Sequence, residues 1–224
     1  MTLIESGGVG LRSMVAAGRR LFGEGFTAEG IAFGGQLDPL ILAQMFAQSG
    51  VDPTPDALAS FREAYAAELA LALETPGVSR TLAGVPELLG ALDDLADACA
   101  LGVLTGNFEE TGRLKLAAAG IDADRFAVRV WGDHSPHDPP AREHLPPVAF
   151  VLHEKILGRT IDPGLVTLVG DTEHDVRAAK MNGCRVLGVA TGYVSAEQLA
   201  KAGADRVVDD LTNTRGVVQW LTMA

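Results

Sequence analysis

The stretch from Leu165 to Asp175 has the residue types of a divalent-metal site. An apolar run typical of a buried strand stops at Gly170, and two carboxylates, Asp171 and Asp175, follow four residues apart at the start of a helical pattern. Open α/β sheets bind ligands at the carboxyl ends of their strands, and Mg²⁺ prefers carboxylate oxygens. The sequence therefore predicts a Mg²⁺ site here. The alternative is that Asp171 only caps the following helix.

A second polar group follows another apolar run. Thr105, Gly106 and Asn107 stand between a predicted strand at 100–104 and a predicted helix. A hydroxyl and backbone N–H groups at the start of a helix can bind phosphate oxygens. Taken alone, these residues are explained better as a helix cap by Thr105 or Asn107. Whether these residues bind phosphate depends on which other side chains the fold places at the same edge of the sheet.

The pattern of apolar residues predicts the elements that must position these groups. Apolar residues at helical spacing make the first third of the chain all-helical. From Leu82 onward, strands with near-continuous apolar runs alternate with helices, which indicates a parallel sheet covered on both faces. The predicted helices are 9–22, 39–49, 54–75, 86–98, 109–119, 144–157, 172–182 and 195–202, and the predicted strands are 100–104, 127–130, 165–169, 185–189 and 206–208.

Composition narrows the class of partner. The 224 residues carry a net charge of −11, so nucleic acid and anionic membranes are repelled on average. The chain has no apolar run of about eighteen residues that would span a membrane, and its start lacks the pattern of a signal peptide. The two cysteines, Cys99 and Cys184, lie far apart beside apolar runs, which is typical of buried thiols in a reducing compartment. We expect a cytoplasmic protein.

The order of these motifs resembles the haloacid dehalogenase (HAD) superfamily, and specifically its phosphoglycolate-phosphatase-like branch with a helical cap. The resemblance implies an α/β fold in which a Rossmann-like parallel sheet forms the HAD core and an all-helical cap is inserted. It places the cap at residues 7–80 and the core at 81–224 together with 1–6. The helical first third and the α/β remainder of the chain agree with that division.

The resemblance also implies roles for individual residues. Thr105 stands where the family's second motif holds phosphate, with Gly106 and Asn107 beside it. Asp171 stands where the first carboxylate of the fourth motif ligates Mg²⁺. Asp175 stands where the second carboxylate of that motif supports the site or shares the metal. The basic residue of the third motif corresponds to Arg142.

One alternative to Arg142 remains open. The family usually has a lysine followed five residues later by a proline, and here Arg142 and Pro147 take those places. Lys155 is the rival for the basic role, but it lies within a helical pattern.

The beginning of the chain departs from the family. Its members open with a strand ending Asp-x-Asp-Gly-Thr-Leu, in which the first aspartate is the nucleophile and the second the general acid/base. This sequence opens at Met1-Thr2-Leu3 and has neither aspartate. Because the missing strand is central in the family, we expect a gap in the middle of the sheet. Two explanations stay open. The sequence given lacks residues that stand upstream in the full protein, which is the explanation we favour, or the protein has lost its catalytic activity.

The function implied is Mg²⁺-dependent hydrolysis of a small phosphorylated metabolite, a phosphoglycolate-like monoester, through an aspartyl-phosphate. The chain as given is then inactive. The alternative is a non-catalytic phosphate-binding or interaction protein. A third possibility, dehalogenation, has no need of a magnesium site.

The cap offers one candidate stretch for substrate contact. Gly35, Gln36 and Asp38 form its polar, flexible turn, although an ordinary turn capped by Asp38 explains them equally well. Glu173 and His174 are expected to face outward. The sequence leaves the identity of the metabolite and the oligomeric state open.

Overall fold

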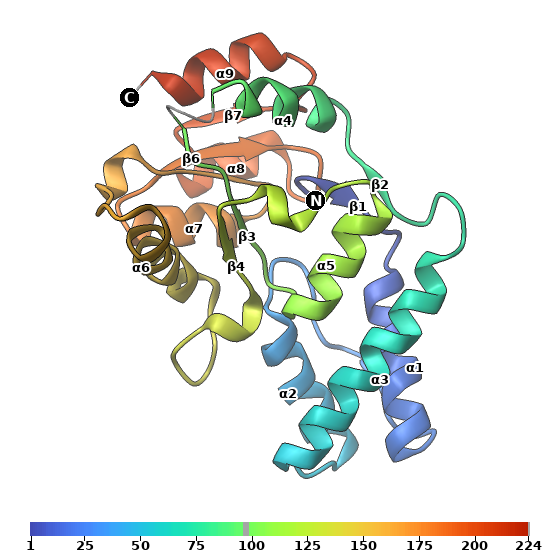
Figure 1. Cartoon of the computed structure of the whole chain (residues 1–224). Helices are drawn as coiled ribbons and strands as arrows, with labels where there is room; N and C mark the ends of the chain where they lie inside the picture. The colour runs from blue at the N-terminus through green and yellow to red at the C-terminus, as the bar shows by residue number, and fades with distance from the viewer. Residues whose placement is uncertain (96–98, 224) are drawn as a thin grey trace.

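The computed structural model describes residues 1–95 and 99–223 (Figure 1). Its α-helices are α1 (Val9–Phe22), α2 (Asp38–Ser49), α3 (Pro55–Leu73), α4 (Val85–Asp93), α5 (Glu109–Ala118), α6 (Leu145–Leu157), α7 (Glu173–Met181), α8 (Ala196–Ala202) and α9 (Thr214–Thr222). Its strands are β1 (Ile4–Glu5), β2 (Arg80–Thr81), β3 (Gly102–Leu104), β4 (Val128–Val130), β5 (Thr167–Gly170), β6 (Arg185–Val189) and β7 (Arg206–Val208). The α/β class predicted from the sequence is confirmed.

The parallel sheet is in two pieces. Strand β3 pairs with β4, while β5, β6 and β7 pair in that order, and every one of these pairs is parallel. Within the described residues no strand joins β3 to β5. The expected gap is therefore present, and the two pieces run in visibly different directions (Figure 1). The motifs at Thr105 and Asp171 follow the two strands that border this gap, β3 and β5.

Helices cover both faces of the larger piece. In β6, Leu187 and Val189 pack into a cluster with residues of α4 and α9, while Val186 packs into another with residues of α7 and α8. This alternation is what a strand buried on two faces requires, since successive side chains point to opposite sides. The carboxyl ends of the strands are thereby left free to carry polar groups.

The helices α1, α2 and α3 form a separate layer at the end of the molecule away from α9 (Figure 1). They share one apolar cluster, in which Phe26, Phe46 and Phe61 contact one another with ring centroids 5.8–6.0 Å apart. The segments that flank this layer in the sequence pair with each other as the antiparallel strands β1 and β2. The division at 7–80 remains a prediction, but this pairing lies at its edges.

Three details differ from the sequence expectations. The first third is not entirely helical, because it contains β1. The helix expected at 86–98 ends at Asp93, and its predicted end at Ala98 lies outside the described residues. Helix α9 was not anticipated. Two-residue strands such as β1 and β2 are too short to show any periodicity, and only their pairing with each other defines them.

Among the described residues, no helix is both long enough and apolar enough to cross a membrane.

Candidate active site

The carboxylate of Asp175 is surrounded by donors from the protein itself. Its Oδ2 accepts hydrogen bonds from the Thr172 hydroxyl at 2.7 Å, the Thr172 N–H at 3.0 Å and the Asp171 N–H at 3.2 Å. Its Oδ1 accepts one from Nε of Arg142 at 2.6 Å. Thr172 in turn caps α7. The sequence predicts a metal ligand at Asp175, but both of its oxygens already bind protein donors. It holds the turn and Arg142 in place.

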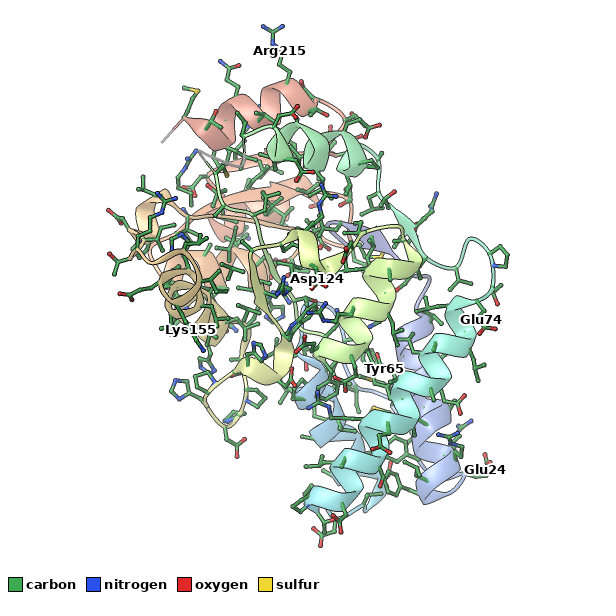
Figure 2. The ribbon with its side chains drawn as sticks, in the orientation of Figure 1. Glu24, Tyr65, Glu74, Asp124, Lys155 and Arg215 are labelled. Atoms are coloured by element: carbon green, nitrogen blue, oxygen red, sulfur yellow. The ribbon has the colours of Figure 1, made fainter. Side chains whose placement is uncertain are left out.

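Arg142 is the basic residue that reaches this carboxylate. It lies in a short 3₁₀ turn, Arg142–His144, ahead of α6. The side chains of Arg142 and Asp175 are only 15% and 7% exposed, so removal of either would leave a buried charge without its partner. The rival, Lys155, is exposed on α6 (Figure 2). This geometry supports Arg142 for the basic role.

Asp171 directly follows β5, and the first residues of the sequence contact its carboxylate. Its Oδ2 pairs with the N-terminal ammonium of Met1, and its Oδ1 accepts a hydrogen bond from the Thr2 hydroxyl at 2.8 Å. The side chain of Asp171 is 12% exposed. Asp171 therefore lies against the residues ahead of β1, at the carboxyl end of β5.

These residues fit Mg²⁺ only as part of an open site. Mg²⁺ in proteins often takes one or two carboxylates and completes its shell with water and substrate phosphate. Within residues 1–95 and 99–223, no group of three or more acidic, histidine or cysteine side chains could hold a metal ion. If Mg²⁺ binds here, Asp171 would be one ligand, and the others would have to come from substrate, from water or from further residues.

The turn after β3 forms the second half of the site. The Thr105 N–H donates to the Val130 carbonyl of β4 at 3.0 Å, so the turn begins where the strand pair ends. The Thr105 hydroxyl oxygen accepts from the Asn107 side-chain amide at 2.7 Å and from the Asn107 N–H at 3.3 Å. The N–H of Gly106 has no hydrogen-bond partner in the described part of the chain. A hydroxyl and a free N–H ahead of α5 can hold anionic oxygens.

The loop ahead of α2, which includes Gly35 and Gln36, bridges the two halves of the site. A Cβ added at Gly35, where φ is +73°, would lie 2.6 Å from Cδ2 of His174 and 3.0 Å from the Thr172 hydroxyl. A Cβ added at Gly106 would lie 2.4 Å from the Gln36 carbonyl oxygen. The loop backbone therefore touches both the start of α7 and the Thr105 turn. His174, expected at the surface, lies beneath this loop.

Gln36 in this loop and Asp38 at the start of α2 behave differently. Asp38 is buried, its N–H donates to the Gly106 carbonyl at 2.6 Å, and its carboxylate accepts from the Phe108 N–H at 3.1 Å. Burial raises the pKa of Asp38, and attraction to Lys115 opposes that shift. The Oε1 of Gln36 is buried with no hydrogen-bond partner among the described residues. Asp38 therefore ties the loop to α5, whereas Gln36 keeps an acceptor that a ligand could use.

Two residues beside Asp171 were missed. The Thr191 hydroxyl donates to the Met1 carbonyl at 2.5 Å, and a Cβ at Gly192 would lie 2.1 Å from Oδ2 of Asp171. Both follow β6 closely, just as Thr105 follows β3. That position after a buried parallel strand was the signal available in the sequence.

Residues 146–214 match the family described as HAD-hydrolase-like. The matched segment includes Asp171 and Asp175 and begins four residues after Arg142. The match therefore includes Asp171 and Asp175 but neither Arg142 nor the Thr105 turn.

Curated relatives and solved structures extend the similarity. Phosphoglycolate phosphatase 1 of Pseudomonas aeruginosa is 29% identical over 166 residues, which cover 72% of this chain and 53% of the relative. The chain spans about half the length of the curated relatives it matches, or less.

Two solved structures share the fold. A predicted phosphoglycolate phosphatase from Haemophilus somnus is 24% identical with a TM-score of 0.66, over 97% of this chain and 93% of that one. CbbY from Rhodobacter sphaeroides, solved in complex with phosphate, is 21% identical with a TM-score of 0.68, over 95% and 91%.

Proposed function

The chain belongs to the HAD superfamily, as a phosphoglycolate-phosphatase-like protein, and from this premise we propose that it carries most of a phosphatase site. The reaction is hydrolysis of a small phosphate monoester of the phosphoglycolate type. Two findings support this substrate class: the curated relatives are phosphoglycolate phosphatases, and a protein of the same fold was solved with phosphate.

One observation carries the proposal. Arg142 is held by Asp175, and Asp175 in turn accepts the Asp171 N–H, so a guanidinium and an acidic metal ligand are fixed together at the end of β5. A buried guanidinium is suited to phosphate, because its donors match phosphate oxygens and its charge is never lost. Helix capping alone would explain Thr172 and Asp175 but would not need Arg142.

Each residue has a defined part in this reaction. The Thr105 hydroxyl and the Gly106 N–H hold the phosphate oxygens, and Arg142 offsets their charge. Asp171 would bind Mg²⁺, which when bound stabilises the negative charge on the transferring group. Placement and electrostatics would supply most of the acceleration, as is general for phosphoryl transfer.

The nucleophile in this proposal is an aspartate on a strand ahead of Thr2. The Thr105 N–H donates to the Val130 carbonyl, and the Leu101 carbonyl accepts from the Val128 N–H, so both residues face β4. Because backbone groups alternate along a strand, the N–H of Leu104 points to the opposite edge. The same alternation points the N–H of Val169 away from β6. Unpaired backbone groups in a protein interior are costly, and one added strand would pair both edges.

An Asp-x-Asp segment at the end of that strand would complete the reaction. Its first carboxylate would take the phosphoryl group as the alcohol leaves, and water would then release phosphate. The 224 residues alone would be inactive.

A second candidate is a non-catalytic phosphate-binding or interaction protein. It would need only the Thr105 hydroxyl and the Gly106 N–H, which has no hydrogen-bond partner among the described residues. Such a protein would bind phosphate without turning over a monoester.

The test extends the chain ahead of Thr2 with an apolar strand ending Asp-x-Asp-Gly and measures Mg²⁺-dependent phosphate release from p-nitrophenyl phosphate. In the extended chain, Asp171→Asn should lower the rate by roughly 10³-fold, because a metal ion contributes several kcal/mol to charge stabilisation. The control, Asp52→Asn, changes an exposed carboxylate of the cap and should leave the rate unchanged. Full activity in Asp171→Asn would contradict the proposal. Phosphate binding without release would support the second candidate.

A further inference from the structure

Lys115 is a lysine of α5 that points into the protein and not into solvent. Its Nζ donates to Oδ1 of Asn107 and, at 3.3 Å, to the hydroxyl of Tyr65. A Cβ at Gly10 would lie 2.8 Å from the same Nζ, so the backbone of α1 closes the remaining side. Burial lowers the pKa of Lys115, and attraction to Asp38 partly opposes this shift. Lys115 as a whole is half-buried, and its enclosed ammonium group is satisfied by the contacts to Asn107 and Tyr65.

The ammonium group dictates how Asn107 is oriented. Lysine has only donors, so Asn107 must present its carbonyl oxygen to Nζ. The amide nitrogen of Asn107 then has to face the Thr105 hydroxyl oxygen, to which it donates at 2.7 Å. Without the lysine, the amide could turn over at little cost, because its two ends are similar in shape.

The orientation of Asn107 in turn fixes the hydroxyl of Thr105. The Thr105 oxygen accepts from both the side-chain amide and the N–H of Asn107, and these two bonds use its two lone pairs. Its hydrogen is therefore directed away from Asn107. A hydroxyl set in this way acts as a donor, which is what an anionic oxygen needs.

We infer that Lys115 is a positioning residue which, through Asn107, fixes the Thr105 hydroxyl as a hydrogen-bond donor to phosphate. The inference rests on the proposed phosphate-binding role of Thr105. Tyr65, at the junction of α3 with α5 (Figure 2), adds a link to the cap, because its hydroxyl accepts the second hydrogen bond from Nζ. The cap thus contributes to the orientation of a group in the core.

The test compares Lys115→Met with Lys115→Arg in the 224-residue chain and measures the Kd for inorganic phosphate by calorimetry. Lys115→Met should weaken binding about tenfold, the value of one hydrogen bond, and Lys115→Arg, which also only donates, should restore it. Lys201→Met, a loss of the same charge at an exposed site, should change the Kd less than about twofold. A Kd in Lys115→Met equal to that of the unmodified chain would overturn the inference.

A double-mutant cycle separates orientation from charge. In a Thr105→Val background the hydroxyl is absent, so Lys115→Met should have no further effect if it acts through Thr105. A further tenfold loss in that background would mean that Lys115 attracts phosphate directly and would overturn the inference.

A ligand-free measurement distinguishes failure of this inference from failure of the proposed function. In NMR spectra the side-chain amide protons of Asn107 should exchange slowly with water in the unmodified chain. This protection should be lost in Lys115→Met and kept in Lys115→Arg. If phosphate does not bind but the amide behaves in this way, the proposed function fails while the orienting role stands. An amide unaffected by Lys115→Met would overturn the orienting role itself.

Discussion

The two halves of the candidate site are held in place by different forces. On the β5–β6–β7 sheet, charge dominates, because Arg142 pairs with a buried Asp175. At the end of β3, the Thr105 turn is held by hydrogen bonds and not by an ion pair: Lys115 donates to Asn107, and Asp38 of the helical layer bonds to Gly106 and Phe108. One half is therefore complete within the core, whereas the other depends on the cap.

This difference indicates how the site would respond to movement of the cap. The Arg142–Asp175 pair shares no hydrogen bond with α1, α2 or α3. The Thr105 turn would lose the hydrogen bonds of Asp38, and the bond between Lys115 and Tyr65 would break. Cap opening should disturb phosphate binding and leave the proposed metal ligand where it is.

Breaking the charged half should have the largest effect. Arg142→Gln leaves Asp175 buried without its cation, so the free energy of unfolding should fall by about 3–5 kcal/mol. Urea denaturation measures this loss. Lys155→Gln, the same chemical change on the exposed part of α6, should alter stability by less than about 0.5 kcal/mol. Equal losses in the two variants would show that Arg142 has no special part in this half.

A substitution in the loop that bridges the two halves should have the second largest effect on stability. Gly35→Ala forces a side chain into the left-handed region and against His174, so we expect a loss of about 2 kcal/mol. Gly50→Ala is the matched control, because Gly50 has a φ of +66° with open space around it. Thermal denaturation should show a smaller loss, about 1 kcal/mol, at Gly50. A Gly35 variant no less stable than the Gly50 variant would mean that the loop does not rest on α7.

The smallest effect expected is a pH dependence of stability that comes from Asp38, in the half of the site that depends on the cap. Burial raises the pKa of Asp38 above its ordinary value of 3.8, so the stability contributed by its protonated form is lost as pH rises through the folded-state pKa. Asp38→Asn keeps an oxygen for the Phe108 N–H, and its stability relative to the unmodified chain should therefore improve as pH increases.

The control for this pH series has the opposite sign. The pKa of Asp210 is lowered by hydrogen bonds from the Thr212 hydroxyl and N–H, so its contribution to stability is present at neutral pH and lost in acid. Asp210→Asn should lose stability, relative to the unmodified chain, as pH rises. Denaturation curves across a pH series that change in the same direction for both variants would contradict this assignment for Asp38.

Much of the fold could be predicted because its elements are locally encoded. Helix α1 was predicted with its observed bounds from apolar spacing, and the buried strand β6 from its continuous apolar run. The gap in the sheet followed from comparison with a family pattern. Strands β1 and β2 could not be predicted, since each has only two residues and depends on pairing across the whole cap.

The site was less predictable because it depends on contacts distant in sequence. The hydrogen bond between Arg142 and Asp175 favours Arg142 over Lys155 as the basic residue of the site. This bond joins residues far apart in the sequence, so only the structure shows it. The sequence likewise could not show that both carboxylate oxygens of Asp175 accept hydrogen bonds from the protein. Lys115 could not be found from its own segment, because a lysine in an amphipathic helix reads as a solvent-exposed residue.

Amide hydrogen exchange at the two strand edges tests most directly whether these halves belong to one site completed by a strand between them. We compare the 224-residue chain with the chain extended ahead of Thr2, following the N–H groups of Leu104 in β3 and Val169 in β5. The amide of Val186, in the paired strand β6, is the control and should not change. Protection of the Leu104 and Val169 N–H groups should rise together in the extended chain. Unchanged protection at both, or a gain at only one, would contradict it.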